Sequence, residues 1–190
     1  LPNGAVFVTK GYYSSGDGGS AEYVYNSASS ATDNGGTVIA PTAGAGRYLL
    51  EVVGVINVRQ FGAKGDGTSE DSQFFRNALN AGIGSLFVPK SIYRIGGSVQ
   101  GSTSLNIPSN FNLIGEGGSK LLVDRGDGTY TANAIRINGV TNVLISGLEI
   151  YSTVTAMGQT TTGIVILGTS LQSKNIRVDS CIFHDLTTGV

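Results

Sequence analysis

The residues that could carry acid–base chemistry gather in the last quarter of the chain, where Glu149, Asp179, His184 and Asp185 occur. Two carboxyl groups can cleave a glycosidic bond when they stand about 5 Å apart, as in retaining enzymes, or roughly 6.5–9.5 Å apart, as in inverting ones. A histidine held by a carboxylate can act as a general base. These four residues are therefore the candidates for catalysis, and the elements that carry them decide whether any two can meet.

A repeat in the sequence places these candidates on neighbouring strands. Residues 142–150 and 175–183 carry apolar side chains at matching positions. Such repetition is expected when successive coils of a solenoid stack their strands about 4.8 Å apart. No acid faces another acid in this register. The facing pairs are Glu149 with Ile182, Asp179 with Ser146, and Asp185 with Ser152.

His184 and Asp185 are adjacent, and His184 is expected to stack near Tyr151. Neighbouring residues of a strand point to opposite sides of the sheet, so the sequence predicts that this histidine and this carboxylate do not meet. Solvated or turn-capping acids are the default interpretation. The catalytic residues therefore stay open at this stage.

The sequence gives little support for a metal site or for a reactive cysteine. Asp17, Asp66 and Asp127 each lie in a Gly-Asp-Gly turn, whereas a calcium loop needs several closely spaced oxygen ligands. We expect turn formation at these positions, no metal and no cofactor. Cys181 falls at an apolar position of the repeat, which predicts a core thiol. As the single cysteine, it excludes an internal disulfide.

Residues 57–80 predict a strand that ends in a glycine turn and is followed by an amphipathic helix of about 13 residues, roughly 20 Å long. Such a helix can cover the open end of a sheet stack. The expected N-terminal cap is a capping box of Thr68 and Asp71, or Ser69 alone. The structural residues of the turn, cap and helix stripe are Gly62, Gly65, Asp66, Gly67, Thr68, Ser69, Asp71, Phe74 and Phe75.

The rest of the chain reads as short strands separated by Gly, Asn and Ser turns. Strands are expected at 5–9, 22–25, 37–40 and 48–53, and again at 85–88, 111–114, 134–137, 143–145 and 163–167. The expected domains are a small β leader module (1–56), the glycine turn with its capping helix (57–84), and the first coils of a solenoid (85–190). The terminal Gly189-Val190 resembles the start of a further coil, so we expect a truncated, amino-terminal fragment.

Composition narrows the function classes. The chain has 190 residues with 29 glycines, 13% charged residues and a net charge of −1. This pattern favours an all-β, turn-rich solenoid. It lacks the basic patch of a nucleic-acid binder. It also lacks the long apolar run of a membrane span, so no membrane insertion is expected.

Two segments carry a family resemblance. Residues 58–67 resemble the V-x-x-F-G-A-K-G-D-G run that opens pectate-lyase-like right-handed parallel β-helices, although residues 69–72 read Ser-Glu-Asp-Ser where that family usually has Thr-Asp-Asp-Thr. Residues 11–21, 33–40 and 46–48 resemble the small leader module of bacteriophage tailspikes and related depolymerases. The resemblance implies an all-β fold, namely a small β module, one capping helix and the start of a parallel β-helix.

The resemblance also implies a function. It points to a homotrimeric phage tailspike located in the virion tail. The first module would join a baseplate or tail protein. The β-helix of the parent protein would bind, and cleave by hydrolysis or elimination, a bacterial surface polysaccharide. The fragment itself is expected to be structural and inactive. The alternatives are a secreted or prophage-encoded bacterial lyase, hydrolase or epimerase, and a non-catalytic glycan-binding adhesin.

Overall fold

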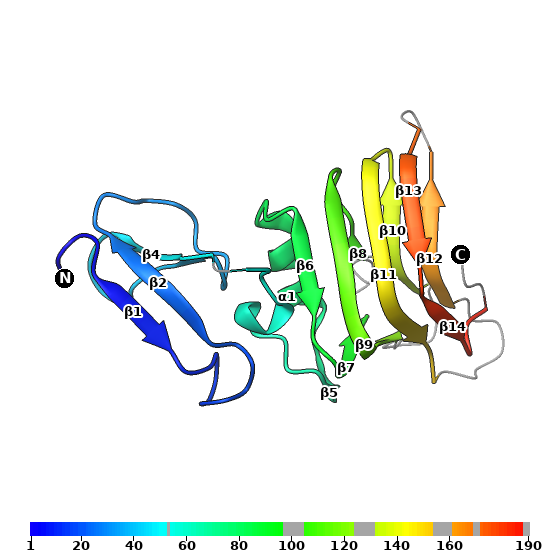
Figure 1. The fold of residues 1–190 in the computed structure, drawn as a ribbon, viewed down its shortest axis with the longest axis horizontal. Coiled ribbons are helices and arrows are strands. Elements are labelled where there is room, and N and C mark those ends of the chain that lie inside the picture. The colour runs from blue at the N-terminus through cyan, green and yellow to red at the C-terminus, as the bar shows by residue number, and fades with distance from the viewer. Residues whose placement is uncertain (53, 97–104, 124–131, 154–160, 169–171, 188–190) are drawn as a thin grey trace.

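The computed structural model describes residues 1–190 except 53, 97–104, 124–131, 154–160, 169–171 and 188–190. The expected echo at Gly189-Val190 therefore lies outside the described residues, as does Asp127. Within these residues the fold is all-β apart from two short helices, with a small sheet followed by a right-handed parallel β-helix (Figure 1). Within the described ranges no helix is long and apolar enough to cross a membrane.

The first sheet is a four-stranded antiparallel module. Its strands are β1 (Val6–Thr9), β2 (Ala21–Asn26), β3 (Val38–Ile39) and β4 (Arg47–Leu50), in the order β1-β2-β4-β3. The glycine turns predicted between the strands separate them. Tyr23 and Tyr25 on β2 are buried on one face, so the tyrosines supply the core of a module too small to have another.

The glycine turn that follows differs from the prediction. Residues 58–61 form a 3₁₀ helix, η1 (Val58–Phe61), rather than a strand. Asn57 and Gln60 cap it reciprocally: the Asn57 side chain accepts from the Arg59 N–H, and the Gln60 side chain accepts from the Asn57 N–H. Gly62 ends it with φ = 101°, a conformation that favours glycine.

The capping helix begins later and is shorter than predicted. It is α1 (Ser72–Asn80), nine residues long. Thr68 and Ser69 do not cap it, because both belong to strand β5 (Asp66–Glu70), and their N–H groups donate to the Asp66 carboxylate. Asp71 occupies the N-cap position but makes no side-chain cap. Its carboxylate turns back and accepts from the N–H groups of Lys64 and Gly65 at 2.8 and 3.1 Å.

The apolar stripe of α1 is placed as predicted. Phe75 and Ala78 are fully buried and Leu79 is 3% exposed, while Phe74 packs at the margin of the same core. The helix lies at the end of the stack nearest the module (Figure 1). There it covers the first apolar layer of the solenoid.

The solenoid stacks parallel strands in two main sheets. One has the order β13-β11-β9-β7-β5, with β6 pairing β9 and β14 pairing β11, and the other has the order β12-β10-β8. Its strands are β6 (Ser85–Val88), β7 (Ile92–Ile95), β8 (Leu105–Asn106), β9 (Phe111–Val123), β10 (Ala132–Asn138), β11 (Thr141–Tyr151), β12 (Thr161–Leu167), β13 (Lys174–Asp179) and β14 (Ile182–His184).

The repeat register inferred from the sequence is confirmed. Glu149 pairs with Ile182 and Ser146 with Asp179. At one corner, the side chains of Asn110, Asn142 and Asn175 stack in a ladder. The Asn142 amide donates to Asn110 Oδ1 and the Asn175 amide donates to Asn142 Oδ1, both at 2.9 Å. All three have φ between 54° and 58°, a conformation that asparagine tolerates better than most residues.

Candidate functional site

An ionic cluster lies where β9, β11 and β14 pair side by side. Lys120, Glu149 and His184 contribute to it from three successive coils. Lys120 Nζ lies 2.7 Å from Glu149 Oε1, and His184 Nε2 lies 2.9 Å from the same oxygen. His184 Nδ1 lies 2.7 Å from Asp185 Oδ2. Because the strands are parallel, outward side chains of neighbouring coils stand close enough to bond directly.

Tyr151 completes the cluster. It pairs with His184 across the strands, and the two rings stack with centroids 5.1 Å apart and an interplanar angle of 16°. Lys120 Nζ lies 5.8 Å from the centre of the Tyr151 ring. The Tyr151 ring is thus in contact with both the imidazole and the ammonium group of the cluster.

Each charged group in the cluster stabilises the charged form of its neighbours. Hydrogen bonds from Lys120 and then His184 lower the pKa of Glu149. Hydrogen bonds to Glu149 and then Asp185 raise the pKa of His184. The Glu149 hydrogen bond raises the pKa of Lys120. At neutral pH Glu149 is thus a carboxylate and not a proton donor, whereas His184 is the group able to donate or accept a proton.

One prediction about these candidates was wrong. The sequence predicted that His184 and Asp185 point to opposite sides, yet they are hydrogen-bonded. Strand β14 ends at His184, and Asp185 adopts φ = 54°. The left-handed conformation takes Asp185 out of the strand alternation and returns its carboxylate to the imidazole.

The fourth candidate stands apart from the cluster. Asp179 pairs with Arg177 on its own strand at 3.1 Å, and both side chains are well exposed. Within the described ranges, no contact joins Asp179 to Glu149 or His184. A catalytic role for these four residues stays a prediction.

Lys120 was missed because the repeat changes its length. Leu113 pairs with Ile145 at an offset of 32 residues, but Lys120 pairs with Glu149 at an offset of 29. Residues 115–118, Gly-Glu-Gly-Gly, form an irregularity in β9 that absorbs the difference. The glycines were the available signal, since glycine inside a strand pattern marks a bulge.

Two of the Gly-Asp-Gly carboxylates, those of Asp17 and Asp66, accept hydrogen bonds from nearby backbone N–H groups. Asp17 accepts from the N–H groups of Tyr12, Tyr13, Ser14 and Gly19. These backbone hydrogen bonds hold its pKa well below the usual range, and those at Asp66 do the same. Within the described ranges, no group of three His, Cys, Asp or Glu residues is arranged to hold a metal ion. Cys181 is half-buried beside the core, and burial raises its pKa.

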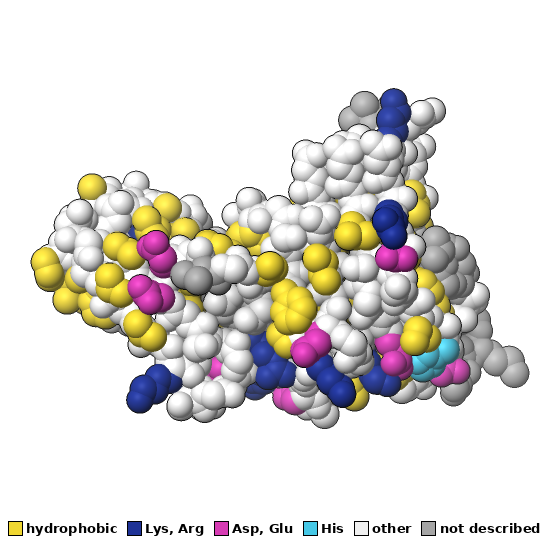
Figure 2. Space-filling view, in the orientation of Figure 1, with side chains coloured by type: hydrophobic (Ala, Val, Ile, Leu, Met, Phe, Trp, Pro, Cys, Tyr) yellow, Lys and Arg dark blue, Asp and Glu magenta, His cyan; other side chains and the backbone are white. Residues whose placement is uncertain are grey.

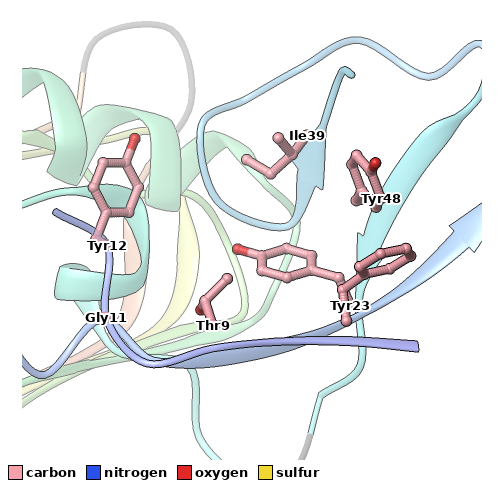
Figure 3. Close-up of a pocket in the computed structure, with 8 residues that line it drawn as sticks. Thr9, Gly11, Tyr12, Tyr23, Ile39 and Tyr48 are labelled. Carbon is pink, nitrogen blue, oxygen red and sulfur yellow. The ribbon is translucent and has the colours of Figure 1, made fainter. Parts of the chain in front are cut away.

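A second site is an apolar pocket in the first module. Its volume is about 360 Å³. Figure 3 shows Tyr12 on one side and Ile39 with Tyr48 on the other, with Tyr23 between them. The Tyr23 hydroxyl donates to the Gly36 carbonyl at 2.9 Å, and burial raises its pKa to about 12. This pocket suits an apolar or aromatic group rather than an ion.

The module and the solenoid meet at η1. Arg59 donates from Nη1 to the Asp17 carbonyl at 2.9 Å and from Nε to the Tyr93 hydroxyl at 3.3 Å. The Tyr13 hydroxyl donates to the Gly62 carbonyl at 2.9 Å. Phe61 is fully buried, and a Cβ added to Gly36 would lie 2.3 Å from its ring. The module is therefore packed onto the capped end of the solenoid.

Both parts match known protein families. Residues 2–53 match the model described as the phage tail protein small four-stranded β-sheet domain. Residues 55–189 match the model described as rhamnogalacturonase A/epimerase, pectate lyase-like. The boundary between the two matches falls at the segment that leads into η1.

Relatives fall into two groups. The mannuronan C5-epimerase AlgE1 of Azotobacter vinelandii is 35% identical over 82 residues, which is 40% of this chain and 6% of that protein. The pre-neck appendage protein of Bacillus phage phi29 is 26% identical over 131 residues, which is 66% of this chain and 14% of that protein. The chain thus spans a small part of the length of either relative.

Solved structures agree on the fold. The enzymatically active domain of tailspike protein 2 from bacteriophage CBA120 superposes with a TM-score of 0.69 at 20% identity, covering 90% of this chain and 24% of that one. The tailspike protein gp49 of the Acinetobacter baumannii bacteriophage Fri1, a capsular polysaccharide depolymerase, gives a TM-score of 0.58 at 16% identity, covering 95% and 40%. At these identities the likeness concerns the fold alone.

Proposed function

Because the chain belongs to the rhamnogalacturonase A/epimerase, pectate lyase-like family, matched over residues 55–189, we propose that it is the virion-proximal part of a phage tailspike. The observation that carries this proposal is the joint at η1. A module of the phage-tail type is packed directly onto the capped start of a pectate-lyase-like solenoid. That arrangement suits a protein that is attached at one end and meets a glycan at the other.

In this proposal the protein is a homotrimer located in the phage tail. The first module binds a baseplate or tail protein, and the β-helix of the parent meets a bacterial surface polysaccharide outside the host cell. Support comes from the phage-tail family model at residues 2–53 and from the phage appendage relatives. The domain division at 1–56, 57–84 and 85–190 belongs to the same proposal.

We assign cleavage to the parent rather than to these 190 residues. The parent would be a polysaccharide depolymerase, either a glycoside hydrolase or a lyase. Hydrolysis by two carboxyl groups needs a free acid and a free base, but Glu149 is bonded to both Lys120 and His184. The cluster therefore serves in this proposal as a polar surface and a tie between coils.

A second candidate is a bacterial polysaccharide lyase or epimerase. The 35% identity to AlgE1 and to alginate lyase 7 of Azotobacter vinelandii favours it. The phage-tail module distinguishes the two candidates, since in the second it would have no virion partner.

The direct test incubates the parent protein with a panel of bacterial capsules and lipopolysaccharides. New reducing ends would indicate hydrolysis, and ultraviolet absorbance of unsaturated sugars would indicate elimination. We expect the parent to cleave at least one polysaccharide and the 190-residue chain to cleave none. A parent that neither binds nor cleaves any of them, or a chain that turns over substrate by itself, would contradict the proposal.

A further inference from the structure

One face of the module sheet is exposed at its edge strand β1 and partly buried over the other strands. A row of apolar side chains crosses it with one residue from each strand, since Val6 pairs with Val24, Val24 with Leu49, and Leu49 with Val38. Val6 is 56% exposed and Val8, two residues on, is 70% exposed. The opposite face holds the buried tyrosines. We call the side with the apolar row the outer face.

The apolar surface continues beyond the sheet. Val52 and Val55, in the segment that leads to the solenoid, are 58% and 57% exposed. A groove of about 340 Å³ joins them to Val8 on the outer face. Hydrophobic side chains lie over the module and over the solenoid on the same side of the molecule (Figure 2). Contiguous exposed apolar surface that is rimmed by polar residues is typical of protein interaction sites.

Unpaired charges accompany this surface. Glu22 and Glu51 are neighbours on β2 and the end of β4, joined by the Glu51 N–H donating to the Glu22 carbonyl at 2.8 Å. Both side chains are exposed, and within the described ranges neither has an ionic partner. Like charges in facing positions of a sheet destabilise it. A partner surface that supplies a cation would relieve this repulsion.

The chain itself carries a suitable cation. Lys10 follows β1, and strand alternation places it on the side of Val6 and Val8. Lys10 is exposed and, in the part of the chain that the structure describes, forms no ion pair. Among the described residues, the outer face thus carries an acidic pair and a cation that have no ionic partner, beside an apolar row. One copy can therefore offer the cation and the next copy the acids.

We infer that the outer face, with Val52 and Val55, is a contact surface for a second copy of this chain, with Lys10 of one copy pairing with Glu22 and Glu51 of the next. The inference rests on the proposed oligomeric tailspike and specifies which surface joins its subunits.

A charge-swap experiment tests this contact. The molar mass and dissociation constant of the chain would be measured by sedimentation equilibrium. We expect association of the wild type, weakened about tenfold or more by Lys10→Glu or Glu22→Lys, because each places like charges together. The double variant Lys10→Glu/Glu22→Lys restores the pair and should restore association. Glu22→Lys also removes the Glu22–Glu51 repulsion, so the thermal unfolding midpoint of this variant should not fall. An unchanged midpoint would show that weaker association comes from the lost contact and not from unfolding.

A matched pair of apolar variants completes the test. Val52→Asp should abolish association, whereas Ile182→Asp, at an equally exposed (58%) position of the solenoid, should leave it unchanged. A wild type that stays monomeric at its highest soluble concentration overturns the inference. So does association that ignores all the outer-face variants, which would place the contact elsewhere. Polysaccharide cleavage by the parent tests the proposed function separately, so the two can fail independently.

Discussion

Glu149 shares one carboxylate oxygen between a lysine from the preceding coil and a histidine from the following one. This sharing ties three coils together on the outside of the solenoid. The three side chains meet because of the strand register. Lys120 pairs directly with Glu149, and His184 pairs with Tyr151, two residues beyond Glu149 on the same strand.

The pKa of His184 reports on this cluster. His184 is the single histidine of the chain, so its ring gives one NMR titration curve. We expect a pKa above the ordinary 6.5, lowered most by Glu149→Gln and less by Asp185→Asn, in the order of their contributions. Because the folded-state pKa is raised, the stabilisation is full below about pH 6.5 and is lost as pH rises through the raised value. Asp179→Asn is the control and should leave the His184 titration curve unchanged. An unshifted curve in Glu149→Gln would show that the Glu149–His184 hydrogen bond does not form.

Asp71 makes stability depend on pH in the same sense as His184, but over a more acidic range. It is fully buried, and burial raises its pKa to about 6 despite hydrogen bonds from Lys64 and Gly65. The folded state therefore binds more protons than the unfolded state between about pH 4 and 6, and stability falls as pH rises through that range. One pKa unit corresponds to about 1.4 kcal/mol, so the fall is roughly 3 kcal/mol.

Denaturant unfolding at several pH values measures this slope. Asp71→Asn should flatten it between pH 4 and 6. Asp66→Asn should not, because hydrogen bonds lower the Asp66 pKa and move its titration below the range. An equal slope in wild type and Asp71→Asn would show that another group is responsible.

At the scale of elements, much of the fold could be predicted from the sequence. The facing pairs Glu149–Ile182 and Ser146–Asp179 followed from apolar repetition alone. Lys120 escaped because the glycines at 115–118 change the repeat length. The Asp185 contact escaped because positive φ at a non-glycine residue leaves no periodic signal. The helix start was misplaced because Thr68 and Ser69 serve the Asp66 turn instead.

The asparagine ladder is an element-scale feature with a measurable energy. Asn142 donates to Asn110 and accepts from Asn175, with φ = 58°. Asn142→Ala loses both bonds and forces alanine into the left-handed region, so we expect a destabilisation of about 1–3 kcal/mol. Asn142→Gly should cost less, since glycine tolerates that backbone. Asn106→Ala, at an exposed strand position, is the control, and equal effects of all three would contradict the ladder.

At the scale of the whole molecule, the joint between module and solenoid is the feature on which the proposed function depends. At this joint, a module residue without a side chain lies directly against an aromatic ring of the solenoid. Gly36 is the sharpest case, because a Cβ there would lie 2.3 Å from the Phe61 ring. Together with the Arg59 and Tyr13 hydrogen bonds, this contact packs the module against the capped end of the solenoid.

A single methyl group tests the joint. Gly36→Ala should lower stability by about 1–3 kcal/mol through overpacking and should expose the segment between module and solenoid to proteolysis. Gly117→Ala is matched to it, since nothing lies within 4 Å of its added Cβ, and it should behave like the wild type. Loss of stability in both variants would mean that the cause is not the Phe61 contact.

Immunoelectron microscopy of phage particles carrying the parent protein tests the account most directly. One antibody would recognise residues 2–53, the phage-tail module, and a second would recognise the solenoid. The account predicts that both label the tail, with the module nearer the particle and the solenoid farther out. Labelling absent from the particle, or with the solenoid nearer to it, would contradict the account.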